Sequence, residues 1–211
     1  MRRVAGLDLS LAGTAAVVLD DDGRPSAALV FSSVARDTLR APAWLEIHRS
    51  TSVAKGDAAG DYHGTNDVAD AVRVFLRARL RTGSVVGIED HAFGARGTAV
   101  YQLGHLHGIV RRDVVNALAC RFLLLGVGEV KLAATGRGNA EKAEVVAASI
   151  GALELDGLSR PTREALADAY AVARLAYHLE RLRAGRSTSS SVPGDVARLV
   201  AAGLLDRPLI G

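Results

Sequence analysis

Three acidic residues lie in stretches where a carboxylate is costly to bury. Asp8 lies in an apolar strand-like stretch, Glu89 ends a second such stretch, and Asp168 lies within a long helical pattern. Burying a carboxylate is unfavourable unless a positive charge compensates it. A divalent cation does this directly, and Mg²⁺ prefers carboxylate oxygen and water as ligands. The sequence therefore suggests metal-dependent chemistry at a site built from these residues.

The elements that must position these residues follow from the spacing of apolar and turn residues. Strands are expected at residues 2–9, 14–20, 26–34, 84–89 and 121–125, and residues 127–131 are open as a further strand. Helices are expected from Asn66 or Asp67 to 81, over 98–117, from Asn139 to 150 and over 161–183. This order predicts an α/β fold in which a mixed sheet, opening with an antiparallel meander, carries helices on both faces.

Composition narrows the class of protein. A chain of 211 residues fits one domain, and with 49% hydrophobic but only 4% aromatic residues its core must consist mainly of Ala, Val and Leu. The net charge of +3 is compatible with nucleic acid binding. The single cysteine, Cys120, excludes an internal disulfide. We expect a cytoplasmic protein without a membrane partner, because no secretory segment or membrane-length apolar run is recognisable.

The predicted domain covers residues 1–183 and contains a poorly readable insertion at about 36–66. A Ser-rich linker at 184–194 leads to a helical tail at 195–211. The tail carries an apolar stripe that could pack on the domain or on a partner subunit: Val196, Leu199, Val200 and Leu204.

Four stretches together carry a resemblance to a known family. They are Gly6 to Thr14, Gly87 to Phe93, Gln102 to Gly108 with Val130 to Lys142, and Asp168 to Ala173. In these stretches, which cover most of residues 1–183, the chain resembles the Holliday junction resolvases of the RuvC family, within the ribonuclease-H-like superfamily. The third stretch is the most specific, because Lys131 and Lys142 flank Thr-Gly-x-Gly-x-Ala.

The resemblance implies a ribonuclease-H-like fold with a five-stranded sheet whose first and fourth strands are adjacent. It also implies a crossover junction endodeoxyribonuclease that hydrolyses DNA with two Mg²⁺ ions, for which Mn²⁺ can substitute. Asp8 would bridge both ions, Glu89 would hold one, and Asp168 would hold the other. The implied enzyme is a homodimer, with residues 98–117 as the expected interface. It cuts four-way (Holliday) junctions by paired symmetric nicks and leaves 5′-phosphate and 3′-hydroxyl ends.

The resemblance further implies the DNA contacts. Lys142 would contact the reacting phosphate and Lys131 a second phosphate, while Gly136 and Gly138 would let the backbone approach DNA closely. Phe93 would stack on bases near the crossover. Arg96 and Arg137 are candidate phosphate contacts. A branch-migration helicase is a further partner that the resemblance allows.

The chain departs from the family pattern at one site position. The family's fourth carboxylate falls at Ala165, and Glu164 lies next to it, on the same helical face as Asp168. We expect Glu164 to take over this catalytic and metal-binding role, although a water molecule could fill the gap instead.

Competing interpretations keep the fold but change the activity. The chain could be a nuclease for other branched DNA or for an RNA–DNA hybrid, or an inactive junction-binding protein. An ATPase or sugar kinase of the related actin-like fold needs two such domains, which 211 residues do not provide.

Overall fold

The computed structural model describes residues 3–11, 13–34, 37–38, 41–49, 58–90, 98–186 and 194–211. The strands are β1 (Val4–Asp8), β2 (Ala15–Leu19), β3 (Pro25–Ser32), β4 (Leu45–Arg49), β5 (Val85–Glu89) and β6 (Arg121–Leu125). The helices are α1 (Ala58–Arg79), α2 (Thr98–Asn116), α3 (Val127–Thr135), α4 (Lys142–Leu153), α5 (Arg160–Arg183) and α6 (Gly194–Ala201), followed by the short 3₁₀ helix η2 (Leu204–Asp206). None of the helices within these ranges has the length and apolar character needed to cross a membrane.

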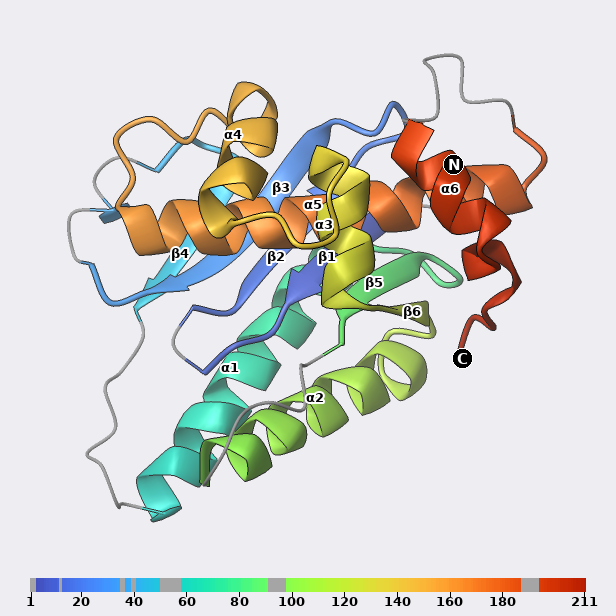
Figure 1. Ribbon diagram of the computed structural model, residues 1–211. Coiled ribbons are helices and arrows are strands. Elements are labelled where there is room, and N and C mark those ends of the chain that lie inside the picture. The colour runs from blue at the N-terminus through green and yellow to red at the C-terminus, as the bar shows by residue number, and fades with distance from the viewer. Residues whose placement is uncertain are drawn as a thin grey trace.

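The strands form one mixed sheet in the order β4-β3-β2-β1-β5-β6 (Figure 1). The meander β1-β2-β3 is antiparallel, whereas β5 runs parallel to β1 and β6 runs parallel to β5. The predicted mixed sheet and the adjacency of its first and fourth predicted strands, β1 and β5, are therefore confirmed. The predicted number of five strands is one too few. The extra strand, β4, comes from the predicted insertion and pairs parallel with β3, where Leu45 is buried.

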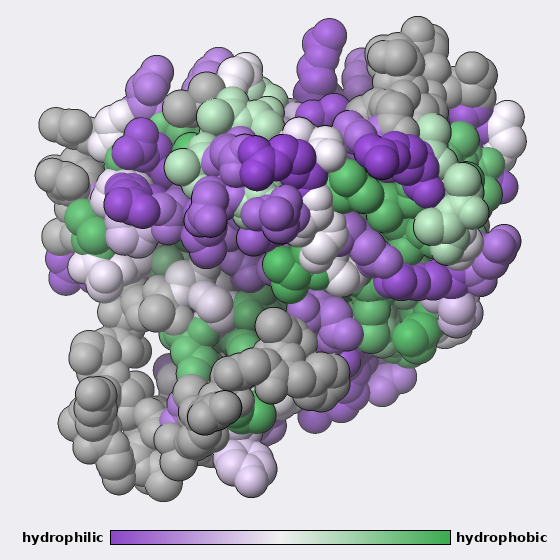
Figure 2. Space-filling model, viewed as in Figure 1, coloured by the Kyte–Doolittle hydropathy of each residue, from purple (hydrophilic) through white to green (hydrophobic). Residues whose placement is uncertain are grey.

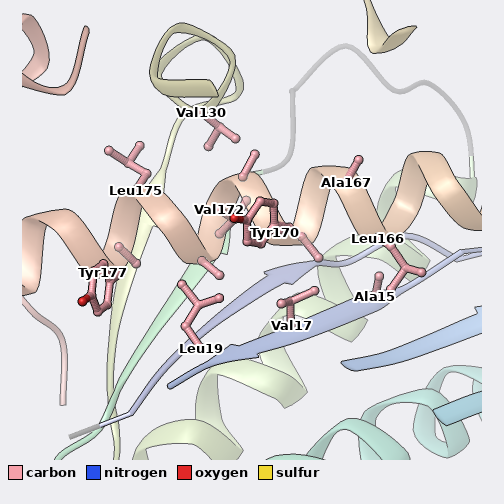
Figure 3. Packing of buried hydrophobic residues seen from close by; sticks show 14 of the residues in the cluster. Ala15, Val17, Leu19, Val130, Leu166, Ala167, Tyr170, Val172, Leu175 and Tyr177 are labelled. Carbon is pink, nitrogen blue, oxygen red and sulfur yellow. The ribbon is translucent and has the colours of Figure 1, made fainter. Parts of the chain in front are cut away.

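Alternate residues along the strands face two helical layers, as the pleat of a strand requires. Val17 and Leu19 face the layer of α5, α3, α4 and α6, whereas Leu7 and Val18 face α1 and α2. Figure 3 shows α5 lying across the sheet, with Leu166 directed at the strands. Both faces are therefore covered, as predicted.

Several helix starts differ from the sequence prediction. Helix α1 begins at Ala58 rather than at Asn66 or Asp67. The alternative of a strand at residues 127–131 is wrong. This segment is helix α3, whose first turn is closed by the Glu129 carboxylate accepting the Gly126 N–H at 2.8 Å.

Helix α4 also begins later than predicted. Its first residue is Lys142, and Asn139 lies in the preceding turn. The Glu144 carboxylate accepts the Glu141 N–H at 2.7 Å and so satisfies one of the free backbone donors at the helix start. Lys142 lies in the first turn of the helix with either start.

The C-terminal tail packs on its own domain. Val196, Leu199 and Leu204 belong to the same buried cluster as α5. The backbone of Ile210 pairs with Phe122 and covers the outer edge of β6. Most of the predicted linker, residues 187–193, lies outside the described residues.

Candidate active site

The carboxylates of Asp8 and Glu89 end two neighbouring parallel strands. Leu7 pairs with Ile88 across the β1–β5 ladder, so the next residue of each strand is acidic. Leu7 and Ile88 are buried against α1 and α2. Because successive side chains of a strand point to opposite faces, Asp8 and Glu89 face the side covered by α5.

Two glycines allow α5 to lie directly on these strands. Gly6 pairs with Gly87 across the ladder, and each lies two residues before its carboxylate. A Cβ atom on Gly6 would lie 2.2 Å from the backbone nitrogen of Ala173, and one on Gly87 would lie 2.9 Å from the Cβ of Ala176. The helix therefore touches the strand backbone. This close approach brings Asp168, which precedes the Gly6 contact at Ala169, over the strand ends.

The three carboxylates influence one another electrostatically. Burial raises the pKa of Asp8 from 3.8 to about 7, and the negative charge of Asp168 acts in the same direction. Burial likewise raises the pKa of Glu89 to about 8, reinforced by the charges of Asp8 and Asp168. Shared negative charge in a poorly solvated place favours any added positive charge. The site therefore has the electrostatic character of a cation-binding site.

Lys142 and Lys131 supply the opposing charge from α4 and α3. The Lys142 ammonium donates to the Asp168 carboxylate at 3.0 Å. Burial raises the pKa of Asp168, while Lys142 and Lys131 act against this shift. Lys131 also lowers the pKa of Glu89. Both predicted lysines thus lie close enough to act on the site carboxylates.

Glu164 lies near the site but is engaged elsewhere. Its carboxylate accepts from Arg160 at 2.7 Å, one helical turn earlier. Its negative charge nevertheless raises the pKa of Asp168 and that of Lys142. Ala165, at the position of the family's fourth carboxylate, is almost fully buried beside Gly13.

The donor set suits Mg²⁺ or Mn²⁺, because all three candidate ligands are carboxylate oxygens. Within the described part of the chain, no three His, Cys, Asp or Glu side chains are grouped so as to hold one metal ion. A two-ion arrangement does not require such a group. Mg²⁺ commonly completes its coordination with water, so it can be held by few protein ligands.

The predicted DNA-contacting loop lies between α3 and α4, where hydrophilic side chains gather in Figure 2. Gly136 ends α3 with a φ of 82°, a left-handed conformation that favours glycine. Gly138 packs on Gly128, whose carbonyl oxygen would lie 3.2 Å from an added Cβ. Arg137 is exposed and pairs with Glu144 at 2.9 Å. Phe93 and Arg96 lie outside the described residues.

Sequence reasoning missed the part played by Gly6 and Gly87. The available signal was a repeated spacing, since Gly6-Leu-Asp8 and Gly87-Ile-Glu89 each place a glycine two residues before a carboxylate. On a strand this spacing puts the glycine and the acid on one face. The glycine then marks where another element can approach the backbone closely.

Comparison with known proteins supports the fold. No protein-family model matches the chain, and no curated protein matches it in sequence. Among solved structures, Thermus thermophilus RuvC is similar, with a TM-score of 0.56 and 23% identity over 87% of this chain and 96% of that chain. RuvC from the same organism in complex with a Holliday junction substrate gives a TM-score of 0.57 and 24% identity, over 88% of this chain and 97% of that chain. The chain therefore has the ribonuclease-H-like fold of RuvC.

Proposed function

We propose that this chain is a divalent-metal-dependent endonuclease whose substrate is a four-way DNA junction. The observation that carries the proposal is that Asp8 and Glu89 end two paired parallel strands under α5, close enough to Asp168 for its charge to raise the pKa of both. The fold supports it, because a solved structure with this fold contains RuvC with a Holliday junction substrate.

The proposed chemistry assigns a role to each charged residue. Bound Mg²⁺, or Mn²⁺ in its place, would activate the attacking water and stabilise the leaving oxygen of the phosphodiester. Asp8 would bridge two ions, while Glu89 and Asp168 would each hold one. Lys142, which already donates to Asp168, would contact the reacting phosphate. The products would carry 5′-phosphate and 3′-hydroxyl ends.

Further residues would hold the DNA rather than cleave it. Lys131, Gly136, Arg137 and Gly138 would contact the phosphate backbone beside the site. Arg96 would contact a further phosphate, and Phe93 would stack on bases near the crossover. A homodimer would place two such sites on the junction, because the two-fold symmetry of a junction matches that of a C2 dimer. Two symmetric nicks would result.

The direct test is cleavage of a labelled synthetic four-way junction, with Mg²⁺ and with EDTA. We expect paired nicks with Mg²⁺ only, and no nicking by Asp8→Asn, because the substitution removes the shared ligand. Junction affinity should change little, since phosphate contacts supply most of the binding energy. The matched control is Asp22→Asn, which makes the same charge change at the exposed β2–β3 turn.

The outcomes separate the competing interpretations. Cleavage of a plain duplex or an RNA–DNA hybrid as fast as the junction would make the chain a nuclease for another substrate. Junction binding without nicking would make it an inactive binder. Nicking by Asp8→Asn at the normal rate would mean that the site lies elsewhere.

The inactive binder is favoured by one specific observation, that Ala165 replaces the fourth carboxylate while Glu164 is paired with Arg160. Ala165→Asp tests this point. If Glu164 is an imperfect replacement, the new carboxylate should maintain or increase the Mg²⁺-dependent nicking rate. Ala165→Asn, similar in size but uncharged, is the control. Complete loss of nicking in Ala165→Asp, but not in Ala165→Asn, would argue against Glu164 acting in place of a carboxylate at position 165.

A further inference from the structure

A buried polar cluster ties the predicted insertion to the start of helix α5. Its members are Ser32 at the end of β3, Asp37 in the insertion, and Ser159 and Thr162 at the first turn of α5. Asp37 is 0% exposed, and the other three side chains are at most 5% exposed. The cluster therefore joins parts of the chain that are far apart in sequence.

The Asp37 carboxylate accepts hydrogen bonds both from β3 and from the start of α5. One oxygen accepts the Ser159 N–H at 2.8 Å, and the other accepts the hydroxyls of Ser159 and Thr162, each at 2.6 Å. The Ser32 hydroxyl donates to it from β3 at 3.0 Å. All four donors are neutral. Burial alone would raise the pKa of Asp37, but the hydrogen bonds from Ser159, Thr162 and Ser32 hold it below its ordinary value.

Helix α5 contacts the strands through small side chains where it crosses the two glycines. Where it crosses Gly6 and Gly87 it presents Ala169, Ala173 and Ala176, together with Val172. Small side chains fix the separation between helix and strand but resist sliding and rotation weakly. Hydrogen bonds are directional, so the cluster at the first turn can fix the rotation and axial position of the helix.

We propose that Asp37 is a positioning residue for the acidic residues of α5, Asp168 and Glu164. This inference rests on the proposed nuclease function. It means that a residue of the insertion fixes the position of the α5 carboxylates relative to Asp8 and Glu89. Asp168 lies six residues, or about 9 Å of helix, beyond Thr162. A displacement of about 1 Å at a reacting centre can cost about 100-fold in rate.

Asp37→Asn is the main test variant, because it keeps the size of the side chain and removes its charge. Tyr177→Phe is the matched control. It removes an anchor of the same helix, the Tyr177 hydroxyl that donates to the Asp21 carbonyl at 3.0 Å, far from the carboxylates. Both variants are compared with the wild type below their melting temperatures, so that lost stability is not mistaken for lost positioning.

Two readouts do not depend on cleavage. Amide hydrogen exchange of residues 163–168 should speed up in Asp37→Asn and stay unchanged in Tyr177→Phe. Mn²⁺ affinity, measured by calorimetry without DNA, should fall about 10-fold to 100-fold in Asp37→Asn only. The Mg²⁺ concentration for half-maximal nicking should rise in parallel. If Asp37→Asn does not fold, Thr162→Val removes one of the four hydrogen bonds to Asp37, together with the bonds of Thr162 to Ser32 and Ser159, and should give a smaller effect in the same direction.

The outcomes keep the two proposals separate. Equal effects of Asp37→Asn and Tyr177→Phe on amide hydrogen exchange and on Mn²⁺ affinity would overturn the inference. Asp37 would then stabilise the fold without positioning the α5 carboxylates. A wild-type protein that neither binds Mn²⁺ nor nicks would overturn the proposed function instead. The exchange measurement would then still decide whether Asp37 fixes the first turn of α5.

Discussion

At the scale of single residues, Asp8 and Glu89 show how position alone changes the chemistry of a carboxyl group. The two residues end neighbouring parallel strands, β1 and β5. Burial raises the pKa values of both carboxyl groups far above those of free side chains. A carboxyl group with a raised pKa stabilises the fold only while it is protonated. This contribution is complete below the ordinary pKa and is lost as pH rises through about 7 for Asp8 and about 8 for Glu89.

Mg²⁺ should therefore stabilise the protein more strongly as the pH rises. Metal ions bind the ionised carboxylates, so at low pH they compete with protons. We expect the Mg²⁺-induced rise in melting temperature to be larger at about pH 8.5 than at about pH 6. A thermal melt with and without Mg²⁺ at each pH measures this. Asp8→Asn should reduce the difference, and a pH-independent shift in the wild type would contradict the assignment of these ligands.

At the scale of elements, the site depends on how closely α5 approaches β1 and β5. The paired glycines Gly6 and Gly87 leave no room for side chains beneath the helix. The buried cluster around Asp37 then sets where the helix begins. The distance between α5 and the strands, and the position of α5 along them, are thus set by different parts of the chain.

Gly6→Ala should accordingly destabilise the fold severely. Its new methyl group would overlap the backbone of Ala169 and Ala173, which cannot move aside as a flexible side chain could. We expect a loss of about 3 kcal/mol or more in the free energy of unfolding, measured by denaturant titration. Gly151→Ala is the control, because a Cβ there meets no atom within 4 Å in helix α4, and it should be neutral or slightly stabilising. Similar stability of the two variants would show that α5 does not rest on β1.

The sequence predicted the strand half of the site better than the helical half. The apolar pattern identifies β1 and β5, and their final residues are directly readable as acids. The register of α5 is set by contacts between Asp37 and Ser159, which are 122 residues apart and leave no local signal. Residues 127–131 suit a strand by composition, yet Glu129 closes a helical turn with Gly126. The edge strand β4 has a weak sequence signal, because only Leu45 is buried in it, so Ile47 could be assigned to a strand only as an open alternative.

At the scale of the whole molecule, helix α2 presents an exposed face that suits the proposed dimer. Tyr101 is 81% exposed, and Cβ atoms added to Gly104 or Gly108 would meet nothing within 4 Å. Glycine in an exposed helix costs about 1 kcal/mol relative to alanine. Two glycines on this face are therefore unfavourable in a monomer but would allow a second helix to approach closely.

The double variant Gly104→Ala/Gly108→Ala separates these possibilities. If α2 forms the dimer interface, the added methyl groups should hold the two helices apart and weaken the dimer. Analytical ultracentrifugation over a range of protein concentrations measures the change. If the face is only solvated, the variant should be more stable and its oligomeric state unchanged, so the interface would have to lie elsewhere.

The most direct measurement is an anomalous difference map from crystals of the protein soaked in Mn²⁺. If Asp8, Glu89 and Asp168 hold the proposed divalent cations, manganese density is expected beside the Asp8 carboxylate, towards Glu89 on one side and towards Asp168 on the other. The same soak of Asp8→Asn crystals should lose this density. A wild-type map with manganese only at other places, or with none, would contradict the account.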